Sequence, residues 1–167
     1  MTRFFGHISC VVAAVIVAGC SQQDSPSAAE VDAATESLMA TQVQPEAQVY
    51  WDAVQFISDA DGLHEIVPET DADWERTIEA ARELKALGEE LQQPAYAANR
   101  GADWQDFSQG LVDIATRAEA AALSKDPHKV LDAGGVLYNV CSACHEQYME
   151  LKAGAAPIAQ RPADLQQ

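Results

Sequence analysis

Apolar residues recur every three or four positions in four long stretches of this 167-residue chain, and proline, glycine or aspartate separates the stretches. Such spacing gathers the apolar side chains on one face of an α-helix, so it predicts four amphipathic helices. We expect the first from residue 35 to about 60, with a kink or restart at Pro45. No stretch reads as a β-strand, and the predicted fold class is therefore all-α.

Residues that start and stop helices lie at the borders of these stretches. Thr70 followed by Asp73 has the pattern of a capping box, which predicts the start of the second helix. The third helix is expected to start at Asp103, and Asp126 before Pro127 predicts the N-cap of the fourth. We expect the Asp61-Gly62 pair to end the first helix.

Four amphipathic helices joined by short-to-moderate loops favour an antiparallel four-helix bundle over residues 35–153. The core of such a bundle is a usual place for a cofactor. Four large aromatic residues within the helical stretches are interpreted as core packing, namely Trp51, Trp74, Trp104 and Tyr138.

A C-x-x-C-H run in the last expected helix carries most of the functional information. It consists of Cys141, Cys144 and His145, which share one face of a helix because they are three and four positions apart. Two thiols and an adjacent imidazole at this spacing are what covalent attachment of a c-type haem requires. The pattern therefore predicts haem attachment near the end of the last helix.

Two other uses of a cysteine pair are less consistent with the chain. A structural zinc site needs four ligands, commonly two such pairs, and only one pair remains once the leader is removed. A thioredoxin-like thiol switch would require a βαβ context. A haemless lipoprotein with a thiol switch stays as the weakest alternative.

The N-terminal residues have the pattern of an export signal. Arg3 precedes an apolar run of roughly ten residues, and Val-Ala-Gly leads to Cys20. This end resembles a bacterial lipobox, so we expect residues 1–19 to be a signal peptide, with Cys10 lost and Cys20 lipidated. Residues 20–34 are expected to form a flexible tether and residues 154–167 a disordered tail.

The placed motif and the helix count resemble the class II cytochromes c, that is cytochrome c prime and its low-spin relatives. Tyr148 lies where this family keeps an aromatic residue, in C-x-x-C-H-x-x-[FY]. The resemblance covers the predicted bundle and implies one haem c per chain. It further implies thioether links at Cys141 and Cys144 and proximal iron ligation by His145. Met149-Glu150 departs from the Arg or Lys that commonly follows the aromatic residue.

The sixth iron ligand divides this family by function, and the sequence leaves it open. Met39 follows Leu38 in the first helical stretch, which is similar to the Leu-Met pair that supplies a distal ligand in low-spin members. Methionine–histidine ligation raises the reduction potential and suits electron transfer. The alternatives are an empty or water-bearing site, which would bind NO or CO, and another side chain such as His64. Met149 is set aside because it lies beside the haem motif.

The formal net charge of −16, from 26 acidic against 10 basic residues, bears on partners. It argues against nucleic acid and against adsorption to anionic lipid. An acidic surface can steer encounters with basic redox proteins in the periplasm or the membrane. We expect a periplasmic, lipid-anchored electron carrier rather than an enzyme. Ser21 weakly favours the outer membrane, and a homodimer is an open alternative to a monomer.

Overall fold

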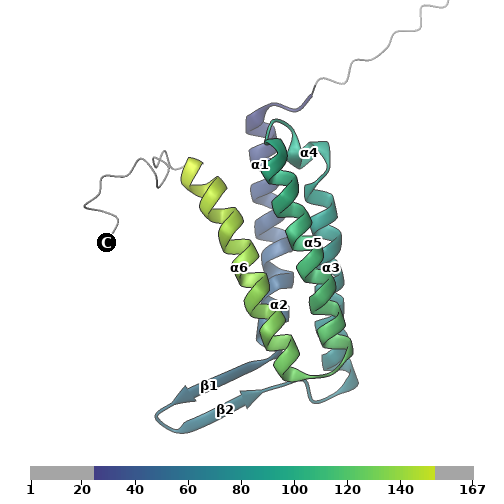
Figure 1. Cartoon of the computed structure of the whole chain (residues 1–167), viewed down its shortest axis with the longest axis vertical. Helices are drawn as coiled ribbons and strands as arrows, with labels where there is room; N and C mark the ends of the chain where they lie inside the picture. The colour runs from purple at the N-terminus through teal and green to yellow at the C-terminus, as the bar shows by residue number, and fades with distance from the viewer. Residues whose placement is uncertain (1–24, 153–167) are drawn as a thin grey trace, which may run out of the picture.

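A computed structural model describes residues 25–152 and is mainly helical, as predicted. The leader, the lipidation site at Cys20 and the tail from residue 154 lie outside the described residues. None of the described helices combines the length and the apolar character that a membrane crossing requires. The elements in chain order are α1 (Ala28–Leu38), η1 (Met39–Val43), α2 (Gln44–Ala53), β1 (Gln55–Asp59), β2 (Gly62–Ile66), α3 (Asp71–Leu91), α4 (Pro94–Ala97), α5 (Gly101–Leu123) and α6 (Pro127–Lys152) (Figure 1).

The first helix begins earlier than predicted, so the expected tether is wrong for residues 28–34. Ser27 forms a capping box with Glu30, in which each side chain bonds the backbone N–H of the other residue. This box satisfies two N–H groups that have no partner within the helix and places the start of α1 at Ala28. Residues 25–27 are not helical, and the part of the expected tether before residue 25 lies outside the described residues.

Pro45 neither breaks nor restarts the first helical segment. The chain forms a π-helical turn, η1, immediately before it, and the N–H of Gln44 bonds to the carbonyl of Met39 five residues earlier. Leu38, Val43 and Gln44 all keep right-handed helical backbone angles. The wider turn accommodates a residue that lacks an N–H and whose ring would clash with the carbonyl four residues back.

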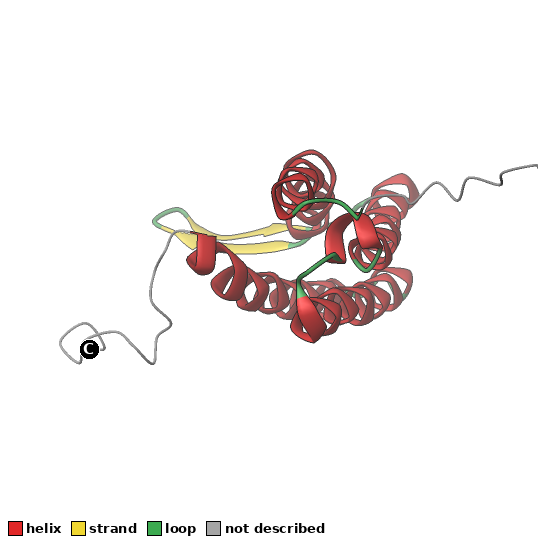
Figure 2. Cartoon of the chain, turned by 90° about the horizontal axis from the view of Figure 1, so that it is seen from above, coloured by secondary structure: helices red, strands yellow, loops and turns green. Residues whose placement is uncertain are grey.

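The first helix ends at Ala53, and an antiparallel hairpin follows where the sequence predicted more helix. The fold stays mainly helical, as the all-α class predicts, but the expectation that no stretch forms a strand is wrong: β1 pairs with β2, with Asp59 opposite Gly62. Gly62 has a φ of +127°, which few other residues tolerate, and the N–H of Asp61 donates to the Asp59 carboxylate at 2.9 Å. Asp61-Gly62 is thus a hairpin turn, and the two strands project to one side of the helices (Figure 2).

The predicted caps of the second and fourth helices are confirmed, since Thr70 and Asp73 form a capping box and Asp126 accepts the N–H of His128 at 3.0 Å.

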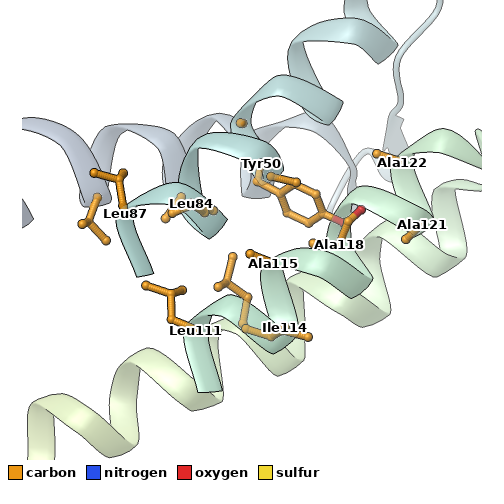
Figure 3. Packing of buried hydrophobic residues seen from close by; sticks show 14 of the residues in the cluster. Tyr50, Leu84, Leu87, Leu111, Ile114, Ala115, Ala118, Ala121 and Ala122 are labelled. Atoms are coloured by element: carbon orange, nitrogen blue, oxygen red, sulfur yellow. The ribbon is translucent and has the colours of Figure 1, made fainter. Parts of the chain in front are cut away.

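The core lies where α2, α3 and α5 pack together (Figure 3). Tyr50 is fully buried, and its hydroxyl donates to the carbonyl of Ala118 at 3.1 Å. Other large buried side chains of the same core cluster are Leu84, Leu87, Leu111, Ile114 and Leu137.

The aromatic residues divide between core and periphery. Trp74 and Trp104 are buried, so their assignment to the core is confirmed. Trp51 is only half-buried, and Tyr138 is 61% exposed, so the core assignment of Tyr138 is wrong. Tyr138 comes one residue after Leu137, the last buried residue of α6 among residues 127–149. Beyond this point the backbone of α6 diverges from the other helices, as its upper end in Figure 1 shows, while the Tyr148 side chain still reaches α5.

Candidate functional site

The divergent half of α6 forms one wall of a pocket of about 890 Å³. Cys141, Cys144 and His145 all line this pocket, so the structure brings the predicted motif residues together on one helix face. Both thiols are half-buried, whereas the His145 side chain is exposed. Most of the surface that lines the pocket is apolar.

A second wall comes from the first helical segment. Met39 of η1 lines the same pocket, is half-buried, and packs against the core cluster. Ala40, Val43 and Ala47 continue this wall along η1 and α2 with small or branched apolar side chains. The π-helical turn therefore faces the C-x-x-C-H helix across the pocket. Single π-helical turns within α-helices are frequent at functional sites.

The positions of His64 and Met149 differ from what the sequence led us to expect. His64 lies on the hairpin, where its Nε2 is 3.0 Å from the Asp59 carboxylate, and it does not line the pocket. The hypothesis that His64 is a distal ligand therefore has no geometric support. Met149, which we set aside, does line the pocket and is 60% exposed. It extends from α6, the same helix as His145.

Aromatic rings close the end of the pocket near Cys144. Tyr148 packs edge-to-face against Trp104, with ring centroids 5.0 Å apart, and against Phe107 at 6.2 Å. Its hydroxyl donates to the carbonyl of Arg100 at 3.3 Å. Burial is the largest cause that raises the pKa of Tyr148, so the phenol stays protonated at neutral pH. These contacts tether the end of α6 to α5.

Arg100 is a pocket residue that sequence reasoning missed. Its guanidinium bonds the Asp32 carboxylate at 2.6 Å and the Thr35 hydroxyl at 3.2 Å, and its carbon lies 4.1 Å from the centroid of the Trp104 ring. The spacing of Arg100 and Trp104, four positions apart at a helix start, was the available signal. The partners on α1 are 65 and 68 residues away and gave no local signal.

The two thiols are protonated at neutral pH. Burial raises the pKa of the Cys141 thiol. Burial, followed by the adjacent Cys141 thiol, raises the pKa of Cys144 to about 11, although the charge of Arg100 opposes this shift. A thiol switch relies on a thiolate at neutral pH, usually at a lowered pKa. This environment therefore argues against that alternative.

Trp51 and Tyr138 form the opposite end of the pocket. The Trp51 indole N–H donates to the carbonyl of Gly134 at 3.0 Å, and the two aromatic rings meet edge-to-face at 6.1 Å. Both residues also border a smaller pocket of about 460 Å³, which Phe56 and Val130 help to line. The aromatic pair therefore lies between the two pockets.

The residues fit a covalently held planar apolar group better than a bare metal ion. Within residues 25–152, no group of three or more His, Cys, Asp or Glu side chains could hold a metal ion. The pocket instead combines apolar walls, two protonated thiols, an imidazole and one buried cation. A porphyrin with vinyl groups, a central iron and carboxylate substituents has complementary chemistry.

Comparisons with known proteins identify no relative: no family model, no curated protein and no solved structure matches this chain.

Proposed function

We propose that this chain is a c-type cytochrome that carries single electrons on a four-helix-bundle scaffold. The observation that carries the proposal is that Cys141, Cys144 and His145 share one wall of a large, mainly apolar pocket. The pocket volume of about 890 Å³ lies at the upper end of the range for small-molecule and cofactor sites. The continuous segment α1–η1–α2, together with α3, α5 and α6, would supply the four helices.

The two thiols would hold the haem covalently. Cys141 and Cys144 would each form a sulfur–carbon bond to one vinyl group, whose double bond would become single as the thiol hydrogen passed to the other vinyl carbon. The raised pKa values of Cys141 and Cys144 keep that hydrogen on sulfur at neutral pH. The addition is balanced without an oxidant or a reductant.

His145 would be the proximal iron ligand, since it lies one position after Cys144 on the same pocket wall. A bound haem supplies an iron that accepts one electron from a reduced donor protein and gives it to an oxidised acceptor protein. Met39 would be the distal ligand, because it lines the pocket from η1, on a different wall from His145. Its thioether would favour the reduced state of the iron.

Gas binding is a second candidate function, and it has support from the pocket wall that η1 and α2 form. Met39 is half-buried against the core, and Ala40, Val43 and Ala47 beside it offer no ligand atoms, although the exposed Glu36 and Gln44 of the same segment also line the pocket. If the Met39 sulfur stays in the core, the distal position would be left to water or to a small gas. The alternative function is therefore reversible binding of NO or CO.

The proposed location is the periplasmic side of a bacterial membrane, with a lipid on Cys20 and the outer membrane weakly favoured by Ser21. The net charge of −16 supports basic redox proteins as partners.

Optical spectra of the haem-loaded protein, oxidised and reduced, with and without CO, separate the two functions. Electron transfer predicts a low-spin spectrum that CO barely changes, and reversible one-electron reduction. A high-spin spectrum that shifts on adding CO would instead support gas binding and contradict ligation by Met39.

A further inference from the structure

One positive charge lies inside the pocket. Arg100 is the single lysine or arginine among the pocket-lining residues of the described chain, and its side chain is only 10% exposed. A guanidinium stays charged at any physiological pH, so this charge is permanent. The two carboxylates that line the pocket, Glu36 and Glu146, are both exposed, and water screens their charges more strongly.

The guanidinium is held from three helices. Asp32 and Thr35 of α1 accept its hydrogen bonds at 2.6 and 3.2 Å. The Trp104 ring of α5 lies 4.1 Å from it, and the Tyr148 ring of α6 lies 5.7 Å from it. Contacts on these sides leave the planar group little freedom to turn, so its position relative to the pocket is fixed.

The ion pair between Arg100 and Asp32 has its positive side toward the pocket and its negative side away from it. Arg100 lines the pocket, whereas Asp32 does not, and the Asp32 side chain is 44% exposed. Water therefore weakens the field of the carboxylate more than that of the buried guanidinium. The positive end of the pair faces the pocket, close to the end that holds Cys144 and Tyr148.

We propose that the fixed charge of Arg100 raises the reduction potential of the group held by Cys141, Cys144 and His145. The inference rests on the proposed haem site. A fixed positive charge in a region of low dielectric constant stabilises the state that carries one more electron, so Arg100 raises the potential. Asp32 holds Arg100 in place and partly offsets its charge.

The test measures the reduction potential of the haem-loaded full chain by spectroelectrochemistry. Arg100→Met removes the charge and keeps an unbranched stem, Arg100→Lys keeps the charge, and Asp32→Asn removes the opposing charge. Arg82→Met is the matched control, because Arg82 also pairs with carboxylates (Glu75, Glu79 and Glu119) but is 43% exposed and does not line the pocket.

We expect Arg100→Met to lower the equilibrium constant for reduction by about tenfold, which for one electron is ~59 mV. Arg100→Lys should restore most of the potential, Asp32→Asn should raise it, and Arg82→Met should leave it unchanged. A purely structural clamp would make Arg100→Met and Asp32→Asn shift the potential in the same direction, or not at all, while both lower the thermal midpoint. That result overturns the inference.

A failure of the proposed haem site and a failure of the role of Arg100 give different results. If Arg100→Met does not load haem, the opposite shift in Asp32→Asn and the retained potential of Arg100→Lys still decide the matter. If the unmodified chain itself binds no covalent haem, the proposed function fails and this inference fails with it. Unchanged potentials in a loaded protein would contradict the role of Arg100 alone.

Discussion

The indole N–H of Trp51 donates to the carbonyl of Gly134 at 3.0 Å, and this bond joins α2 to α6 just before α6 leaves the other helices. Trp51→Phe removes the donor and keeps an aromatic ring, so the free energy of unfolding should fall by about 1 kcal/mol. Urea denaturation measures the change. Tyr138→Phe is the control, because it alters an exposed side chain and should stay within about 0.5 kcal/mol. Equal effects of the two variants would contradict a role for the Trp51 bond.

The buried hydroxyl of Tyr50 predicts a pH dependence of stability. Burial raises its pKa well above the ordinary value, so the folded protein keeps this proton where the unfolded chain loses it. The unfolded state then binds fewer protons, and the free energy of unfolding falls as the pH rises above about 10. Tyr50→Phe removes this contribution. The difference in unfolding free energy between the two proteins, measured from pH 8 to 11, should decrease; a constant difference would contradict the assignment.

The close approach of α3 to α5 predicts a cost for any side chain at position 88. A Cβ on Gly88 would come within 2.9 Å of the Val112 side chain and 3.1 Å of the Val112 backbone nitrogen. Gly88→Ala should therefore lower the free energy of unfolding by about 1–3 kcal/mol, despite the better helix propensity of alanine. Gly135→Ala is the control, because nothing lies within 4 Å of a Cβ there. It should raise stability by up to about 1 kcal/mol. Thermal or urea unfolding of both variants decides whether the contact matters.

Substitution of Met39 should change the optical spectrum of the haem-loaded protein. If its sulfur is the distal ligand, Met39→Ala in the haem-loaded protein should convert a low-spin spectrum to a high-spin one and allow CO to bind. Met149→Ala is the matched control, since Met149 lines the same pocket but lies on the helix of His145. Spectra of Met39→Ala that match the unmodified protein would remove Met39 from the site.

Local signals in the sequence predicted two helix starts correctly, whereas the third expected helix begins at Gly101 instead of Asp103, after Arg100, which makes no side-chain cap. The cap at Thr70 and Asp73 and the cap at Asp126 involve residues within three positions of each other, so their pattern is complete in a short window. Ser27 and Glu30 have the same pattern and mark the start of α1, although they lie in a segment whose composition suggested a tether. The capping pattern was the better guide to this boundary than composition.

The hairpin and the pocket needed information from the fold. Ile57 continues the helical spacing of the first stretch, but it also suits a strand, and Asp61-Gly62 acts as a hairpin turn instead of a helix end. The placement of Cys141, Cys144 and His145 on one wall followed from helix geometry. The position of Arg100 depends on partners in α1 that are more than 60 residues away, and no local pattern contains that contact.

The most direct test of the central claim is the mass of the intact chain under denaturing conditions, after export in cells that carry a c-type haem maturation system. We predict a mass increase of one haem that survives denaturation and maps to the peptide with Cys141 and Cys144. The double variant Cys141→Ser, Cys144→Ser should lose this increase, whereas Cys20→Ser should lose only the lipid. An exported chain with unmodified Cys141 and Cys144, or a haem that denaturation releases, would contradict the assignment of this protein as a c-type cytochrome.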